Sequence, residues 1–272
     1  MDLHHTEIAL RLDQLMGLSV ELGNMHNIPL LLERILEVAK QITYADGGTL
    51  YRVSADQKSL CFYIVFNDSL GIYKGGTQGS AIDLPNIPLL NNDGEDNLSS
   101  VAAYAAHTGQ SVNIPNVYDS ELFDFSAMRQ FDEQHYYVSR SFLAVPMRDH
   151  EGQLIGVLQL INAQNPVTGM THEFSATDQR FIEALASQAA IAISRQELIK
   201  RVDTIFASFI NLISLTSKEQ PGAAGKSLSE ALHTLDNFRD KHHIDPEVFE
   251  LFVRQKMVVE YAKRLIDPVQ VV

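Results

Sequence analysis

The spacing of apolar residues changes twice along this chain, first from helical to alternating and then back to helical. Near the start it follows steps of three and four, at Leu32, Ile35, Leu36, Ala39 and Ile42. Between residues 47 and 162 the apolar runs are short, and they either alternate or are apolar almost throughout. Residues 174–215 return to the helical spacing. Because strands repeat every two residues and helices about every 3.6, the chain is predicted to fold as an α+β protein.

The alternating region predicts a central antiparallel sheet of about six strands, flanked by helices. The runs 47–54 and 59–67 flank the polar turn "ADQK" and indicate a hairpin. The glycines of "ADGG" at 45–48 predict the end of the preceding helix, whose first turn contains Pro29. Residues 68–97 are rich in Gly, Asn, Asp and Pro, which predicts one long loop.

A short helix is predicted after this loop, followed by the second half of the sheet. "SVAAYAAHTG" is expected to be helical, with Asn97 or Ser99 as its cap and Gly109 at its end. "SVNIPNVY" is expected to be a short extended piece, and an open segment then leads to a strand at 140–147. Residues 153–162 are apolar almost throughout, which predicts a central strand covered on both faces.

Two helical patterns lie at the ends of this region. Residues 6–22 carry one apolar stripe, and residues 174–215 form a single long pattern that Ser175 caps together with Asp178. The apolar positions of the long pattern continue to Leu198 and beyond, past the length that one small domain covers. Since such a helix usually packs on a partner helix, we expect a homodimer through the N- and C-terminal helices.

The chain is expected to have four parts. "KEQPGAAGKS" has the composition of a linker and separates the long helix from the last part. The parts are an N-terminal dimerisation helix (1–27), the central domain (28–196), the continuation of the long helix (197–219) and a small helical tail (220–272).

Charge and cysteine content narrow the expected partners and compartment. The net charge of −13 argues against nucleic acid, because binding phosphate backbones requires clustered Lys and Arg. Cys61 is the only cysteine, which fits a reducing compartment. The first residues lack the apolar core of a signal peptide, and no run reaches the roughly 20 apolar residues of a spanning helix. We expect a cytoplasmic protein that binds neither nucleic acid nor membranes.

Four blocks of sequence resemble successive parts of a GAF domain: "TGQSVNIPNVY", "FDEQHYYVSRSFLAVPM", "GQLIGVLQLINAQN" and "FSATDQRFIEALASQAAIAI". The likeness covers residues 28–196 and is to the GAF class of cyclic-nucleotide phosphodiesterases and adenylyl cyclases. It implies a regulatory module that binds a small ligand, such as a cyclic nucleotide, between the sheet and the loops of residues 68–139. It also implies a downstream signalling protein that receives the signal.

The stretch that begins at Phe131 contains two acids and a histidine, Asp132, Glu133 and His135, directly before a buried strand. Catalysis would need a nucleophile or a metal within reach, and the sequence shows neither, so a solvated loop and a pocket lining stay open. The resemblance favours the pocket, because in that family this segment closes over the ligand. The ligand-binding residues that it implies are Thr49, Phe66, Asn67, Val101, Ala102, Asp132, His135, Ser139 and Gln159. For the apolar members of this set, plain core packing is the alternative.

A structural signature of this GAF class is present only in part. Asn162, Phe174 and Asp178 match it, but Ala163 stands where the family has a lysine and Gln179 where it has a glutamate. In the family the lysine pairs with the aspartate. Asp178 is therefore expected to lack its partner.

The C-terminal part resembles the first and closing helices of an HD-GYP phosphohydrolase, in "TIFASFINLISLTSKEQP" and "IDPEVFELFVRQKMVVEYAKRLIDP". The His-Asp pair and the Gly-Tyr-Pro segment of that family are absent from the sequence, and metal-assisted hydrolysis needs several converging ligands. We therefore expect a shortened remnant and a protein without catalytic residues, metal or cofactor. The alternatives are a divergent metal-dependent phosphodiesterase in residues 203–272 and a scaffold that dimerises without a ligand.

Overall fold

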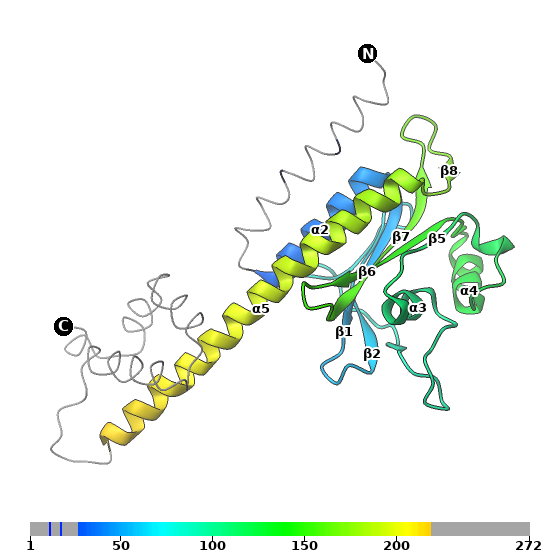
Figure 1. Ribbon diagram of the computed structural model, residues 1–272. Coiled ribbons are helices and arrows are strands. Elements are labelled where there is room, and N and C mark those ends of the chain that lie inside the picture. The colour runs from blue at the N-terminus through cyan, green and yellow to red at the C-terminus, as the bar shows by residue number, and fades with distance from the viewer. Residues whose placement is uncertain (1–10, 12–16, 18–26, 219–272) are drawn as a thin grey trace. The chain divides into compact units, whose positions relative to one another are not determined.

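The computed structural model describes residues 11, 17 and 27–218 (Figure 1). Within the last helix it describes the side chains as far as Lys200 and that of Val202. Apart from residues 11, 17 and 27, the predicted dimerisation helix lies outside the described residues, as does the predicted tail at 220–272. The chain divides into two compact units, Met1–Gln196 and Glu197–Val272.

The described residues form a mixed set of helices and strands, as an α+β fold requires. The helices of the described range are α2 (Ile28–Thr43), α3 (Val101–Thr108), α4 (Ser126–His135) and α5 (Ala176–Lys218), with a 3-10 turn at Val117–Asp119. The strands are β1 (Ala45–Val53), β2 (Ser59–Asn67), β3 (Ile72–Gly75), β4 (Ile87–Pro88), β5 (Val112–Ile114), β6 (Phe142–Arg148), β7 (Leu154–Gln164) and β8 (Thr171–His172). None of the helices in the described range is both long and apolar enough to cross a membrane.

All eight strands pair antiparallel in one sheet. Six of them follow the order β3-β2-β1-β7-β6-β5, while β4 pairs with β2 and β8 with β7. The centre is the long β1–β7 ladder, in which Thr49 lies opposite Gln159 and Leu50 opposite Leu158. The α+β fold with an antiparallel sheet is therefore confirmed, and the two short strands β4 and β8 account for the difference from about six.

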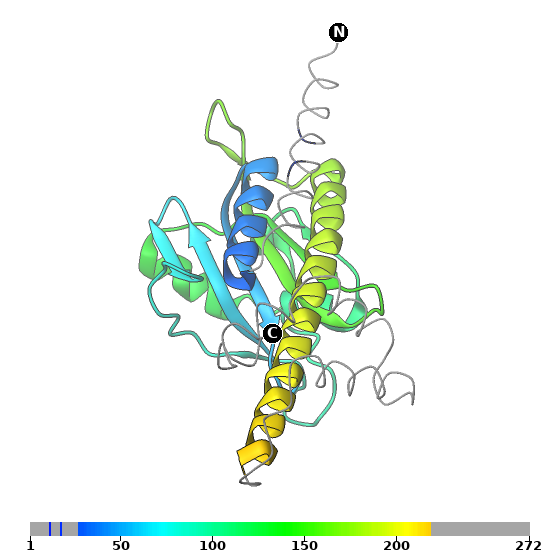
Figure 2. The ribbon, with the colours of Figure 1, turned by 90° about the vertical axis from the view of Figure 1, so that its left-hand side faces the viewer.

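Helices cover both faces of the sheet, and each face has its own apolar cluster. Figure 2 shows α2 and α5 side by side on one face, with α3 and α4 on the other. The first cluster joins α2 and α5 to the sheet and includes Leu31, Ile35, Leu36, Leu50, Leu158, Leu160, Ile182, Leu185 and Ala189. The second cluster lies under α3 and includes Tyr51, Leu60, Ala102, Ala105, Val117, Phe125, Phe142 and Val157.

The glycines of "ADGG" do not end the first described helix, as the sequence predicted, but belong to β1. The helix α2 ends at Thr43, and Tyr44 takes the left-handed conformation, with φ 52°, that turns the chain into the strand. Glycine serves a packing role at position 48, where a Cβ atom would lie 2.6 Å from Cδ1 of Leu36. Because Gly48 has no side chain, α2 can approach β1 closely.

Three segments predicted as loops or caps differ in detail. The long loop at 68–97 contains β3 and β4, and the open segment before β6 contains α4. Ser100, rather than Asn97 or Ser99, is the N-cap residue of α3, and Gly109 ends that helix as predicted. These short elements are stabilised by pairing with β2 and by packing against the second cluster. Their sequences therefore lack the periodicity that reveals longer helices and strands.

Candidate functional site

Two polar side chains face the second cluster from the middle of the sheet. Thr49 and Gln159 are 5% and 7% exposed, and they share this face because Leu50 and Leu158 beside them point into the first cluster. The Thr49 hydroxyl hydrogen-bonds the phenol of Tyr51, whose pKa is raised by burial. The Gln159 side-chain amide has no hydrogen-bond partner among the described residues, and its nitrogen and oxygen keep a small contact with solvent. A largely buried amide that makes no internal hydrogen bond can offer its donors and acceptor to a ligand.

The helix α3 lies over the same region with an uncapped N-terminus. Ser100 occupies the N-cap position, but its side chain makes no capping hydrogen bond. The first-turn N–H groups, at Val101, Ala102 and Ala103, have no acceptor within the helix. These three residues are at most 7% exposed. The positive end of the helix dipole is thus buried next to the sheet, where an anion would be stabilised.

The segment of residues 117–139, called here the α4 segment, covers the second cluster with Val117 and Phe125. Asp132 fixes its shape and is only 2% exposed. Its carboxylate accepts hydrogen bonds from the Tyr118 phenol at 2.7 Å, from the Ser139 N–H at 2.7 Å and from the Ser139 hydroxyl at 2.8 Å. Burial, the bond to Asp132 and its charge raise the pKa of Tyr118 to about 12.

A second polar junction joins the α4 segment to the central strands. The Tyr137 phenol donates to Asp46 of β1 at 2.5 Å and accepts from the Asn162 amide at 2.9 Å. Burial and the neighbouring Asp46 carboxylate raise the pKa of Tyr137. Asn162, at φ 58°, also donates to the Val138 carbonyl and accepts from the Arg140 N–H at 2.7 Å. The sequence motif residue Asn162 therefore fixes the entry into β6.

The nine predicted ligand-binding residues fall into three groups. The second face brings together Thr49, Gln159, Val101 and Ala102. A second group, Asp132 and Ser139, is hydrogen-bonded inside the α4 segment. Asn67 hydrogen-bonds Tyr137 and the Leu70 N–H, and so belongs to the junction with β1. The structure does not bring Phe66 and His135 to this face.

Phe66 lies in the first cluster instead, near the end of β2. Its ring stacks on Tyr73 with centroids 4.5 Å apart, and Lys40 Nζ lies 5.9 Å from the ring centroid. Phe66 and Tyr73 border an open cavity of about 780 Å³ between α2, β3 and the β7–β8 hairpin. His135 is exposed at the end of α4, where its ring stacks on Phe131 and contacts the Phe131 carbonyl.

Sequence reasoning missed Asp46, Tyr118 and Tyr137. Tyr118 bonds to Asp132 within the α4 segment, and Tyr137 bonds the segment to Asp46 of β1. Asp46 was assigned to a helix end, and a tyrosine gives no pattern that separates a hydrogen-bonded phenol from a packed ring. The signal for Tyr137 is its place in the polar stretch directly before β6. A buried strand that begins after such a stretch needs partners for its first backbone groups.

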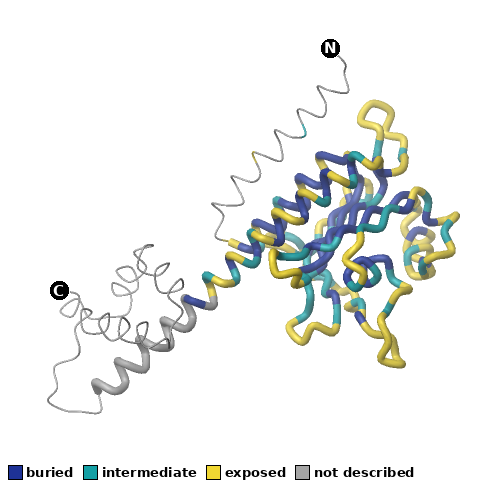
Figure 3. Tube along the Cα trace, in the orientation of Figure 1, coloured by how far each residue is buried: buried dark blue, intermediate teal, exposed yellow. Residues whose placement is uncertain are grey.

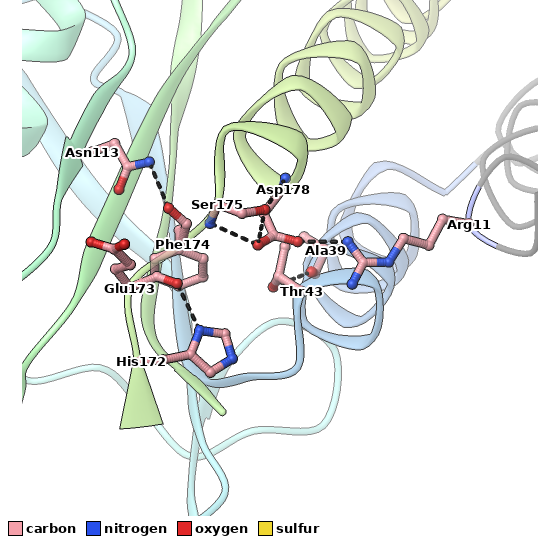
Figure 4. A network of polar contacts seen from close by, with 9 residues as sticks. All are labelled: Arg11, Ala39, Thr43, Asn113, His172, Glu173, Phe174, Ser175 and Asp178. Atoms are coloured by element: carbon pink, nitrogen blue, oxygen red, sulfur yellow. Dashed lines mark hydrogen bonds and ion pairs between the residues drawn. The ribbon is translucent and has the colours of Figure 1, made fainter. Parts of the chain in front are cut away.

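Asp178 has a partner, contrary to the expectation from the sequence. Figure 4 shows its carboxylate between Ser175 and Arg11. The Ser175 hydroxyl donates to Asp178 at 2.7 Å and accepts from the Asp178 N–H at 3.1 Å, which confirms the predicted capping pair. Arg11 Nη1 lies 2.6 Å from the other carboxylate oxygen. The cation comes from a segment before the first described helix, which no motif within the domain could reveal.

Comparison with known proteins places this arrangement in a family. A family model of the GAF domain matches residues 27–193. The Drosophila melanogaster "Dual 3',5'-cyclic-AMP and -GMP phosphodiesterase 11" is 27% identical over 180 residues, which are 60% of this chain and 11% of that protein. The Takifugu rubripes "Dual 3',5'-cyclic-AMP and -GMP phosphodiesterase 11A" is 29% identical over 98 residues, 36% of this chain and 10% of that protein. This chain therefore spans about a tenth of the length of these relatives.

A solved structure shows the same fold. The GAF domain from Acinetobacter phosphoenolpyruvate-protein phosphotransferase has a TM-score of 0.50 and 17% sequence identity, and the match covers 71% of this chain and 98% of that one. At this identity the likeness concerns the fold alone.

Proposed function

Because this chain belongs to the GAF family of regulatory, small-ligand-binding sensor modules, we propose that it binds a cyclic nucleotide on the sheet face under α3. The observation that carries this proposal is the largely buried side-chain amide of Gln159, which is 7% exposed and makes no hydrogen bond to the described residues. An amide offers both donors and an acceptor, which suits the hydrogen-bonding edge of a base. The proposal thus gives the Gln159 amide a hydrogen-bond partner.

The phosphate would lie at the first turn of α3. The N–H groups of Val101 and Ala102 are buried there without a side-chain cap, and the helix dipole favours an anion at this end. The relatives from Drosophila and Takifugu are named for cyclic AMP and cyclic GMP, which supports this class of ligand. The α4 segment would cover the bound ligand, with Asp132 holding the cover in shape rather than touching the base.

Calorimetric titration of the purified chain with cyclic AMP and cyclic GMP tests the proposal. We expect one of them to bind, and Gln159→Leu to weaken that binding about tenfold or more, because the base edge loses its partner. Gln153→Leu is the matched control, since Gln153 is exposed beside the same strand, and its affinity should stay within about twofold. Adenosine or guanosine, which lack the phosphate, should bind at least about tenfold more weakly. Absence of binding by both nucleotides would contradict the ligand class.

We further propose that the chain acts as a homodimer through its terminal helices and passes ligand occupancy to a downstream signalling protein in the cytoplasm. On α5, Ile191 and Leu198 are 44% and 52% exposed and stand seven residues apart, as on one side of a helix. Sedimentation of Leu198→Asp should show a weakened dimer. Val167→Asp, the same kind of change at a 90% exposed valine of the β7–β8 hairpin, should leave the dimer intact. A monomeric parent protein would end this part of the proposal.

The GAF domain is a regulatory rather than a catalytic module. The alternative of a metal-dependent phosphodiesterase concerns residues 203–272, whose side chains lie outside the described part of the chain. Metal analysis of the purified full chain distinguishes the two, because that alternative requires bound ions.

A further inference from the structure

The first turn of α5 carries a carboxylate with two separate tasks. Asp178 is 4% exposed, and its Oδ2 accepts from the Ser175 N–H at 2.8 Å and from the Ser175 hydroxyl at 2.7 Å. Its Oδ1 is directed to the guanidinium of Arg11, with Nη1 at 2.6 Å (Figure 4). One oxygen therefore caps the helix, while the other is available to a cation from outside the helix.

Two aromatic rings lie beside this guanidinium. The Arg11 Cζ atom lies 6.0 Å from the ring centroid of Tyr44 and 5.9 Å from that of Phe181. Tyr44 is placed there by its left-handed conformation at the end of α2, and Phe181 lies one turn after Asp178 on α5. The Arg11 side chain is only 13% exposed. A planar, delocalised cation suits such a position better than an ammonium group, because it stacks on aromatic rings and loses less hydration.

A buried carboxylate is costly unless a cation or several donors compensate it. Among the described residues, Arg11 is the one cation within ion-pair distance of Asp178. The neighbouring strand offers none, since position 163 of β7 is a fully buried alanine. The compensation of the Asp178 charge therefore depends on Arg11, which precedes the first residue of α2, Ile28, in the sequence.

We propose that Asp178, Tyr44 and Phe181 form a receptor for the Arg11 guanidinium, and that this contact, called here the Arg11 clasp, attaches the N-terminal segment of the same chain to the start of α5. The clasp links the segment before the domain to the helix that leaves it. It does not depend on which ligand the opposite face of the sheet binds.

Photocrosslinking tests the clasp in the full chain. The photoreactive residue p-benzoylphenylalanine replaces Tyr44, which is 42% exposed. This replacement keeps an aromatic ring beside Arg11. We expect a crosslink to the peptide that contains Arg11, within a species that runs as a single chain of 30.4 kDa under denaturing conditions. Arg11→Gln, which removes the charge and keeps a polar side chain, should lower the crosslink yield about fivefold or more. A crosslink that joins two chains, or one that Arg11→Gln leaves unchanged, would overturn the proposal.

A double-mutant cycle measures the same contact through stability. Asp178→Asn retains an oxygen for Ser175, so it preserves helix capping while it removes the charge that Arg11 meets. We expect the shift in urea midpoint for the double variant, Arg11→Met with Asp178→Asn, to be clearly smaller than the sum of the two single shifts. Additive shifts would show that the two side chains do not interact, and the clasp would be abandoned.

Discussion

The two faces of the sheet differ in what they bury. The face under α2 and α5 is filled by aliphatic side chains such as Leu36, Leu50 and Leu158, all fully buried. The face under α3 and the α4 segment also buries Thr49 and Gln159 in its middle. Figure 3 shows the buried stretches of α2, α5 and the central strands, with exposed loops around the α3 and α4 side. The first face buries mainly aliphatic side chains at its centre, and the second gives up some apolar burial there for polar groups that a ligand can use.

The same contrast runs between neighbouring residues of a single strand. Leu158 and Gln159 of β7 point to opposite faces, so substitutions at the two positions probe the two faces with the backbone held constant. If the first face determines stability and the second determines binding, the two substitutions should have separate effects. A mutation that moved stability and affinity together would break the comparison.

Leu158→Ala should have the largest effect on stability. The side chain is fully buried in the first cluster, and truncation of such a leucine costs about 2–5 kcal/mol of unfolding free energy through lost burial and a residual cavity. Urea unfolding followed by circular dichroism measures it. Nucleotide affinity per folded molecule should remain within about twofold of the parent value. A loss below about 1 kcal/mol would show that this face is not the main source of stability.

Asp132→Ala should come next, because it removes the acceptor that orders the α4 segment. The half-exposed Tyr118 phenol and the two buried donors of Ser139 lose their partner, and each of the buried donors left unsatisfied costs about 1–3 kcal/mol before water re-enters. We expect a net loss of about 2 kcal/mol, together with weaker ligand binding, since the cover is disordered. The exposed neighbour gives the control: Glu133→Ala should change stability by less than about 0.5 kcal/mol.

Gln159→Leu should have a small effect on stability, and it should stabilise the protein where the two preceding substitutions destabilise it. Gln159 is 7% exposed and its amide makes no hydrogen bond to the described residues, so an apolar side chain of similar size should leave the unfolding free energy level or raise it by up to about 1 kcal/mol. Differential scanning calorimetry without nucleotide shows this as an unchanged or higher Tm. A clear destabilisation would mean that the Gln159 amide already serves the apo fold, and the observation behind the proposed site would be lost.

The main parts of the fold could be predicted because long periodic segments carry their own signal. The helix at 28–43, the hairpin 45–67 and the pair of strands before the long helix all follow from apolar spacing. The α4 helix could not be found in this way, because only Asp132 of its ten residues is buried. Its conformation depends on hydrogen bonds to Tyr118 and Ser139, which no local pattern encodes.

The residues of the candidate site also divide into those with a local sequence signal and those without one. Thr49 and Gln159 could be singled out because a polar residue stands at an inward position of a strand, and strand alternation is local. Phe66 and His135 could not be assigned to a face, because each lies at the end of its element, where the chain turns. The partner of Asp178 is 167 positions away in sequence, so only the folded chain reveals the pairing.

The smallest expected effect concerns Tyr118, a half-exposed phenol at the edge of the second face, 42% exposed. Its pKa is raised from 10.0 to about 12 by burial and by Asp132, so folding favours the protonated phenol. The stability it contributes is therefore complete below pH 10 and is lost as pH rises from 10 to 12. Tyr118→Phe should lower the unfolding free energy at pH 7 by less than about 1 kcal/mol, given the exposure of the group.

The difference between the parent protein and Tyr118→Phe isolates this phenol from Tyr51 and Tyr137, whose pKa values are also raised and which titrate in both proteins. Urea midpoints measured from pH 7 to pH 11 should show a gap that is constant up to about pH 9 and then closes, since the tyrosinate can no longer donate to Asp132. A gap that stays the same at pH 11 would mean that Tyr118 contributes by packing alone. The α4 segment would then depend on Asp132 and Ser139 only, and the polar character of the second face would end at its centre rather than extend to its rim.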